Sequence, residues 1–131
     1  MKALPYQVGI DIVKVCHIQD SIERFGNRFL NRIFTKGELA YCQSLSSASA
    51  VAQSMAARFA AKEATIKVLR PEVYMLDWRN IEIHRSEGGW CDLVLSGEAT
   101  DLARSRGIAA FSVSMSHEEE YATAVVIADT E

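Results

Sequence analysis

The sequence predicts an α+β fold in which helices pack on one face of a largely antiparallel sheet. Stretches of alternating apolar and polar residues, typical of strands, occur at the start of the chain and in its second half. Stretches with apolar residues three or four positions apart, typical of helices, separate them. Long linkers are absent from the sequence. Its 131 residues fit one domain, 1–131, because a single core of ordinary size takes about 100–200 residues.

The chain begins with a predicted strand that is followed by an interrupted helix. Residues 4–15 alternate as in a strand, so Asp11 lies on the face opposite the apolar side chains. Those apolar side chains are Val8, Ile10 and Ile12. Residues 18–33 then carry apolar side chains at helical spacing, and Gly26 interrupts this pattern.

Two further helices are predicted before the middle of the chain. Thr35, with Glu38 three positions later, forms a capping box that opens the first of them. A Ser- and Ala-rich loop follows at 44–50. The second helix covers roughly residues 50–69, because good helix formers dominate there. Pro71 ends it, because the residue before a proline resists the α conformation.

The second half is predicted to hold four strands and one helix. The strands cover residues 80–85, 90–96, 109–116 and 121–128. Turns at 86–89 and 118–120 join these strands into two hairpins. Between the hairpins, Ser96 is placed to cap a helix over 98–105, and Gly107 lies where a C-cap glycine belongs.

The composition excludes several classes of protein. A net charge of −3 argues against a nucleic-acid coat, which needs surplus Lys and Arg. No apolar run approaches the roughly 20 residues that cross a membrane. Asp11 and Lys14 interrupt the first apolar stretch, so we predict no signal peptide and expect a cytoplasmic protein. Three cysteines form no metal pattern and are predicted to be buried or half-buried free thiols: Cys16, Cys42 and Cys91.

The long predicted helix carries the densest group of charges. Glu63 and Lys67 are four residues apart and share a helix face, as do Arg58 and Lys62. From spacing alone, an ordinary solvated face with a weak surface ion pair explains them. The surrounding alanines leave room for a ligand or partner to approach the backbone closely: Ala56, Ala57, Ala60, Ala61 and Ala64.

Asp11 is the second candidate, because an acidic residue inside an apolar strand is costly to bury unless it is paired or binds a metal. It is either a solvated strand residue or a ligand for a hard cation. Mg²⁺ takes one or two carboxylates in many sites, with phosphates and water completing its shell. Asp11 and Glu63 form such a pair if the first strand packs beside the long helix.

The predicted strand at 109–116 has a polar face that ends in His117. Its serines, Ser112, Ser114 and Ser116, either line a site or meet water. A single His at a strand end is more often structural than catalytic. The chain lacks the G-x-S-x-G, Walker and G-x-G-x-x-G motifs, so serine-hydrolase and nucleotide-kinase functions have no support.

Three motifs in order resemble those of the small bacterial holo-acyl-carrier-protein synthases. They are G-I-D at residues 9–11, R-F-A-A-K-E-A-x-x-K at 58–67, and S-M-S-H at 114–117 before a Tyr-Ala strand start. These enzymes are 4′-phosphopantetheinyl transferases. The resemblance implies a homotrimer with active sites between neighbouring subunits. It also implies transfer of phosphopantetheine from coenzyme A to a serine of an acyl carrier protein, which leaves adenosine 3′,5′-bisphosphate.

The resemblance also implies roles for individual residues. Asp11 and Glu63 match the family's Mg²⁺ ligands, and Lys67 matches the lysine that contacts the reacting phosphate. Either Glu63 or a water on the metal accepts the serine proton, so Glu63 and Lys67 are the expected catalytic residues. Three positions match residues near bound coenzyme A: Arg58, Lys62 and His117.

The chain departs from the family pattern at three places. Gln7 replaces a usual glycine, and His17 replaces an arginine of the first helical region, which contacts the carrier. Leu69-Arg70-Pro71-Glu72 replaces a frequent Gly-Thr-Gly loop, which makes Arg70 a candidate phosphate contact. We therefore expect carrier docking on a later stripe of arginines, Arg24, Arg28 and Arg32.

Two other functions remain open from the sequence. One is a carrier-protein or nucleotide-binding module of the same fold with weak or no transferase activity, for which the altered loop speaks. The other is an oligomeric structural domain that binds no ligand. The intact set of Asp11, Glu63 and Lys67 favours the transferase.

Overall fold

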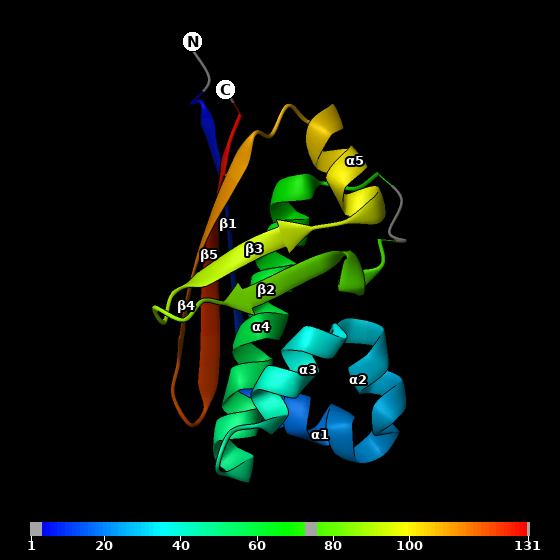
Figure 1. Ribbon diagram of the computed structural model, residues 1–131, viewed down its shortest axis with the longest axis vertical. Helices are drawn as coiled ribbons and strands as arrows, with labels where there is room; N and C mark the ends of the chain where they lie inside the picture. The colour runs from blue at the N-terminus through cyan, green and yellow to red at the C-terminus, as the bar shows by residue number, and fades with distance from the viewer. Residues whose placement is uncertain (1–3, 73–75, 131) are drawn as a thin grey trace.

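The computed structural model describes residues 4–72 and 76–130 and confirms the α+β class (Figure 1). Its first half holds strand β1 and four helices: β1 (Tyr6–Lys14), α1 (Val15–Phe25), α2 (Asn27–Ile33), α3 (Lys36–Gln43) and α4 (Ala48–Leu69). Its second half holds a short 3₁₀ helix, one α-helix and four strands: η1 (Trp78–Asn80), β2 (Ile81–Arg85), β3 (Cys91–Leu95), α5 (Gly97–Ser105), β4 (Ala110–His117) and β5 (Tyr121–Asp129).

The strands within residues 4–72 and 76–130 form two antiparallel sheets rather than one. One sheet has the order β1-β5-β4, and the other is the β2–β3 hairpin. Helix α4 packs against the three-stranded sheet and also contacts β2, so it lies between the two sheets (Figure 1). Helices α1 to α3 gather at one end of α4, and α5 lies toward the other.

The interrupted helical segment is two helices, because Gly26 adopts a positive φ of 54° that ends α1. The capping box of α3 is confirmed. Thr35 Oγ1 accepts a hydrogen bond from the Glu38 amide at 3.2 Å, and Glu38 Oε1 accepts one from the Thr35 amide at 2.8 Å. Ser96 precedes α5 as expected but makes no capping bond, because its hydroxyl contacts Asn80 Oδ1 at 3.3 Å instead.

Strand β1 turns most of its large apolar side chains away from the core. Gly9, Asp11 and Val13 face inward, since α4 packs against that face. The other face leaves large apolar side chains 62–68% exposed: Val8, Ile10 and Ile12. Ile127 of the adjoining strand β5 is 45% exposed and pairs with Val8, so the uncovered apolar surface runs along β1 and onto this part of β5.

All three cysteines are free thiols, as predicted. Cys42 is buried and Cys91 is half-buried, whereas Cys16 is exposed, so its predicted burial was wrong. Among the residues that the structure describes, no helix is both long and apolar enough to cross a bilayer. The cytoplasmic location stays a prediction.

Candidate active site

Helix α4 positions most of the predicted site residues. Ser47 caps its first turn by accepting a hydrogen bond from the Ala50 amide at 3.0 Å. The predicted helix start at residue 50 was therefore two residues late. Its alanines are almost fully buried, which lets strands approach the helix on both sides: Ala56, Ala57, Ala60, Ala61 and Ala64.

Asp11 and Lys67 meet where β1 crosses the last turns of α4. Lys67 Nζ donates a hydrogen bond to the Ile10 carbonyl at 2.7 Å and lies 3.3 Å from Asp11 Oδ1. The Lys67 side chain is 52% exposed, whereas that of Asp11 is 19% exposed. The ammonium therefore remains open to a ligand, while the carboxylate is held between strand and helix.

Glu63 lies one helical turn before Lys67 and belongs to the same group. Burial raises the pKa of its carboxyl, the negative charge of Asp11 raises it further, and Lys67 opposes the rise. The structure thus brings Asp11, Glu63 and Lys67 together, which sequence spacing alone left open.

This acidic pair suits a divalent cation. The negative charge of Asp11 disfavours the ionised form of Glu63, and a dication held between the two carboxylates would relieve that repulsion. Among the described residues no cluster of three or more His, Cys, Asp or Glu side chains could hold a metal. A cation at Asp11 and Glu63 would take its remaining ligands from substrate phosphates and water, which is the usual habit of Mg²⁺.

Arg58 and His117 lie elsewhere, in a cavity of about 480 Å³ bordered by α3, α4, the β2–β3 hairpin and β4. Arg58 is 3% exposed and donates to Ser54 Oγ at 2.6 Å. Its guanidinium carbon lies 4.6 Å from the centre of the Tyr41 ring. A second guanidinium, that of Arg85, lies 5.6 Å from the same ring centre.

The lining of the cavity carries positive charge. Two arginines and His117 line it, and none of its lining residues is Asp or Glu. Arg58 Nε is buried without a hydrogen-bond partner among the described residues. A buried polar group without a partner is costly, so a ligand that accepts from this nitrogen gains affinity. His117 Nδ1 lies 2.9 Å from Gln53 Oε1, which orients the imidazole.

Lys62 does not reach either group, contrary to the expectation that it lies near coenzyme A. Its side chain is 0% exposed, and its ammonium forms a buried ion pair with Glu38 Oε1 at 2.7 Å. It also donates to the main-chain oxygens of Trp78 at 3.1 Å and Ile81 at 2.5 Å. Burial lowers the pKa of Lys62, and Glu38 opposes this. All three ammonium protons are used within the core, so we assign Lys62 to the core of the chain.

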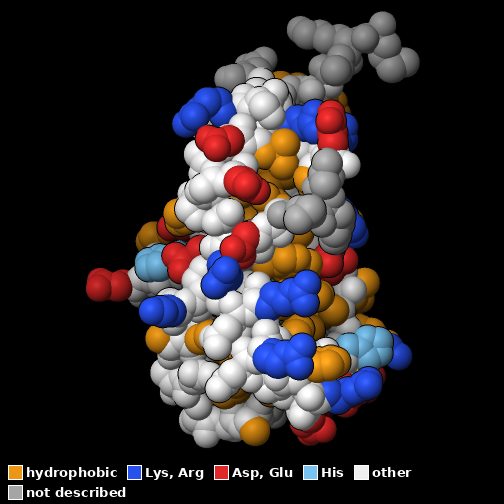
Figure 2. All heavy atoms as spheres, turned by 90° about the vertical axis from the view of Figure 1, so that its right-hand side faces the viewer, with side chains coloured by type: hydrophobic (Ala, Val, Ile, Leu, Met, Phe, Trp, Pro, Cys, Tyr) orange, Lys and Arg blue, Asp and Glu red, His pale blue; other side chains and the backbone are white. Residues whose placement is uncertain are grey.

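The arginine stripe is altered by the break at Gly26. Arg28 and Arg32 stay together on α2 and line a groove of about 600 Å³. Arg24 lies in the last turn of α1, 5.5 Å from the centre of the Phe25 ring, and is not among the residues that line the groove. Figure 2 shows Lys and Arg side chains beside hydrophobic ones over this helical end of the molecule.

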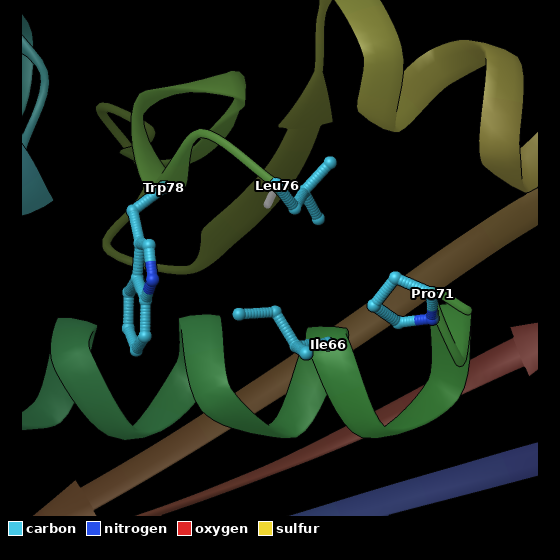
Figure 3. A pocket seen from close by; sticks show the side chains of 4 residues that line it. All are labelled: Ile66, Pro71, Leu76 and Trp78. Carbon is cyan, nitrogen blue, oxygen red and sulfur yellow. The ribbon is translucent and has the colours of Figure 1, made fainter. Parts of the chain in front are cut away.

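The floor of this groove is aromatic. Phe59 of α4 stacks on Phe29 of α2, with ring centres 6.4 Å apart, and on Trp78 of η1 at 5.0 Å. Trp78 also borders a small apolar cleft with Pro71, Ile66 and Leu76 at the end of α4 (Figure 3). Trp78 thus borders both the groove and the cleft at the end of α4.

Sequence reasoning missed several of these residues. Arg85 and Trp90 stand beside a predicted turn, where charged and aromatic residues are common, and only the fold brings them to Arg58. Glu38 was explained by its capping role. The spacing of the sequence does not predict that Glu38 Oε2 accepts a hydrogen bond from the Ile83 amide, or that Glu38 pairs with Lys62.

Comparison with known proteins gives the family. The family model of the 4′-phosphopantetheinyl transferase superfamily matches residues 7–126. The chain belongs to this superfamily. A relative from Koribacter versatilis named holo-[acyl-carrier-protein] synthase is 44% identical over 120 residues, covering 91% of this chain and 94% of that protein. One of the same name from Moorella thermoacetica is 40% identical over 124 residues, covering 95% and 94%.

Solved structures of the superfamily share the fold. One described as a Chronobacterium ammoniagenes ACPS–CoA complex superposes with a TM-score of 0.84 at 28% identity, covering 99% of both chains. The Helicobacter pylori holo-[acyl-carrier-protein] synthase in complex with coenzyme A superposes with a TM-score of 0.78 at 32% identity, covering 93% of this chain and 99% of that one. This phosphopantetheinyl transferase chain thus matches its relatives over nearly its whole length.

Proposed function

We propose that the chain is a Mg²⁺-dependent holo-acyl-carrier-protein synthase. It transfers 4′-phosphopantetheine from coenzyme A to a serine hydroxyl of an apo acyl carrier protein and releases adenosine 3′,5′-bisphosphate. One observation carries this proposal: β1 and α4 bring Asp11, Glu63 and Lys67 into one group. The names of the relatives and the coenzyme A complexes of similar structures support it.

In this proposal Asp11 and Glu63 hold the Mg²⁺. Bound there, the ion would neutralise charge on the diphosphate of coenzyme A. The serine oxygen attacks the phosphorus that bears the pantetheine, and the bond from that phosphorus to the departing nucleotide phosphate breaks. The half-exposed Lys67 ammonium stabilises the negative charge that develops on the phosphate oxygens.

Glu63 is our candidate for the base that accepts the serine proton. A useful general base has a pKa near the working pH, and in the metal-free chain burial together with Asp11 raises the pKa of Glu63 above its ordinary value. Water in the site is the alternative acceptor. Loss of turnover in Glu63→Gln does not distinguish Glu63 from water as the proton acceptor. Asp11→Asn removes the charge beside Glu63. A shift in the acidic limb of the pH–rate profile of this variant supports Glu63 as the acceptor.

The cationic cavity is our candidate for the nucleotide end of coenzyme A. That end carries a phosphate monoester and a diphosphate, which match two guanidiniums and an imidazole with no opposing carboxylate in the lining: Arg58, Arg85 and His117. Trp90 also lines the cavity and is 63% exposed, so its ring is available to stack on the adenine.

We propose that copies of the chain assemble as a homotrimer with sites between neighbours. Within one chain, the lining of the cavity does not include Asp11, Glu63 or Lys67. The uncovered apolar face of β1 offers the surface that an assembly would bury. Sedimentation of the purified protein tests the trimer, and restored activity in co-expressed Glu63→Gln and Arg58→Gln chains tests sharing of sites. A monomer at working concentrations would contradict both.

One assay tests the function directly. The chain is incubated with coenzyme A, Mg²⁺ and an apo carrier protein, and intact mass is measured. We expect one phosphopantetheine to be added to the carrier. A carrier with its acceptor serine replaced by alanine, and a reaction with chelator, should show no addition. If coenzyme A binds but no carrier gains mass, the chain is the binding module instead.

A further inference from the structure

Helix α4 ends in a left-handed residue that is not glycine. Arg70 has φ 51° and ψ 59°, and no other non-glycine residue among those described has a positive φ. This conformation crowds the β-carbon of an L-residue, which is why glycine usually stands at such a helix end. The Arg70 amide keeps a helical hydrogen bond to the Ile66 carbonyl at 2.9 Å, and the strained turn that follows is open to further support from a side chain.

The side chain of Arg106 supplies that support. Its Nε donates to the Leu69 carbonyl at 3.2 Å, and its Nη2 donates to the Arg70 carbonyl at 2.6 Å. The last carbonyls of an α-helix have no partners within the helix, so both bonds satisfy exposed acceptors. The guanidinium also places positive charge at the negative end of the α4 dipole.

Arg106 is itself fixed in place. It ends α5, where its amide donates to the Leu102 carbonyl at 3.0 Å. Gly107 follows with a φ of 73°, which turns the chain at once toward β4. The guanidinium therefore extends from the end of α5 to the end of α4, where its two nitrogens donate.

The turn that Arg106 holds lies between Lys67 and Pro71 in the chain. Before it, the last turn of α4 carries Lys67, which bonds the Ile10 carbonyl and Asp11. After it, Pro71 lies beside Ile66 at the helix end (Figure 3). A change in the turn would move both.

We infer that Arg106 is a positioning residue for the end of α4. Its forked hydrogen bonds hold Arg70 in the left-handed turn, and the turn fixes Lys67 against Asp11. Glycine permits a left-handed turn because it lacks a β-carbon, whereas here the side-chain donors of Arg106 stabilise the turn. The part that concerns turnover rests on the proposed function of Lys67, whereas the coupling of Arg106 to Arg70 does not.

Four proteins test this inference: the natural chain, Arg106→Gln, Arg70→Gly and the double variant. In the natural background, Arg106→Gln should lower Tm by about 3–5 °C. It should lower kcat about tenfold, because displaced catalytic groups lose rate steeply, while KM for the carrier stays unchanged. In the Arg70→Gly background the same change should cost less than half as much in Tm and leave kcat within about twofold. Comparison within each background cancels any contact of the Arg70 side chain with substrate.

Arg104→Gln is the matched control. Arg104 lies on the same helix, 78% exposed, and its only ion pair among the described residues is a loose one to Asp101 at 3.8 Å. This change should leave Tm and kcat unaltered. Should Arg106→Gln fail to fold, Arg106→Lys keeps the charge and one donor and replaces it in the cycle.

Equal losses in both backgrounds would overturn the inference, because Arg106 would then act independently of Arg70. A coupled loss of Tm with unchanged kcat would also overturn it, since Arg106 would only stabilise the fold. If the natural chain transfers no phosphopantetheine at all, the proposed function fails. The coupling in Tm then still decides whether Arg106 holds the turn.

Discussion

Gly9 of β1 lies directly against the main-chain carbonyl of Ala64 of α4, and a β-carbon at position 9 would overlap that oxygen. Ala64 is fully buried and adds only a methyl group to the contact. Side chains two residues apart share a strand face, so this approach also turns Asp11 toward α4. The distance between strand and helix at Gly9 thus sets the distance between Asp11 and Glu63.

Gly9→Ala should force β1 away from α4. We expect a loss of about 1–3 kcal/mol in the free energy of unfolding, as for other overpacked sites. Activity per folded molecule should fall as well, because Asp11 moves with the strand. Urea unfolding and steady-state turnover measure the two effects. Gln7→Ala, on the same strand and face, is the control and should retain activity. Equal turnover in both variants would mean that the contact between Gly9 and Ala64 does not position the candidate site.

Glu63→Gln should lower kcat about a hundredfold or more while leaving the fold intact, because it removes one charge that serves the metal and the proton transfer. Mg²⁺ should raise the Tm of the natural chain but not that of the variant. Glu87→Gln, on the exposed hairpin turn, is the control. A variant that turns over normally would remove Glu63 from the site.

The same variant should gain stability in the absence of metal. The pKa of Glu63 is raised from 4.5 in the folded chain, so between the unfolded and folded values the native state binds more protons. Stability is therefore lost as pH rises through this window. Glu63→Gln removes that loss, so its Tm should exceed that of the natural chain at pH 7, and the gap should close as pH falls to 4.5. A gap that widens toward low pH would contradict the raised pKa.

The groove on α2 predicts how the carrier docks. Carrier proteins are generally acidic, so Arg28→Glu with Arg32→Glu should raise KM for the carrier about tenfold or more and spare that for coenzyme A. Added salt should weaken docking in the natural chain and less so in the variant. Arg24→Glu reverses one such charge outside the groove and should have little effect. If Arg24→Glu is as damaging, docking uses the whole stripe.

Arg85 predicts a preference for the 3′-phosphorylated donor. If the cavity holds the phosphate monoester, Arg85→Gln should raise KM for coenzyme A about tenfold, the cost of one charged hydrogen bond. KM for 3′-dephospho-coenzyme A should stay unchanged. The KM values for the two donors therefore become more similar in the variant. Arg79→Gln removes an exposed arginine outside the lining of this cavity and is the control. Equal effects on both donors would place the monoester elsewhere.

The buried pair of Glu38 and Lys62 predicts a strong dependence of each residue on the other. Lys62→Met should cost about 3–5 kcal/mol, because it leaves the Glu38 charge buried and unpaired. Adding Glu38→Gln should recover part of that loss, since a neutral amide oxygen can still accept from the Ile83 amide. Chemical denaturation measures Lys62→Met, Glu38→Gln and the double variant. An additive double variant would mean that the two side chains do not interact.

The sequence predicts the elements better than their arrangement. Local chemistry places the Thr35 capping box and the break at Gly26, because both are decided within a few residues. The division into two sheets depends on which strands pair, and alternation along a strand says nothing about its partner. The exposed apolar face of β1 is likewise invisible, since alternation does not tell which face meets α4.

The grouping of the candidate residues was predictable where motif and helix spacing agreed. Glu63 and Lys67 share a face of α4, and Asp11, which the sequence already offered as the partner of Glu63, lies beside them on β1. Lys62 was misplaced because its partner Glu38 lies on another helix, so nothing near it in the sequence distinguishes it from a surface lysine. The role of a buried charged residue follows from its partner in the fold, which lies far away in the sequence.

The ion pair between Glu38 and Lys62 also bears on how this sequence can drift. Each residue makes the other indispensable, so a lineage that loses either one first passes through a poorly folded intermediate. Replacement of both residues is open only to a double event or to a chain with stability to spare. Relatives should therefore keep both residues or replace both. Lys62, next to Glu63 in the sequence, would then owe its persistence to folding rather than to chemistry.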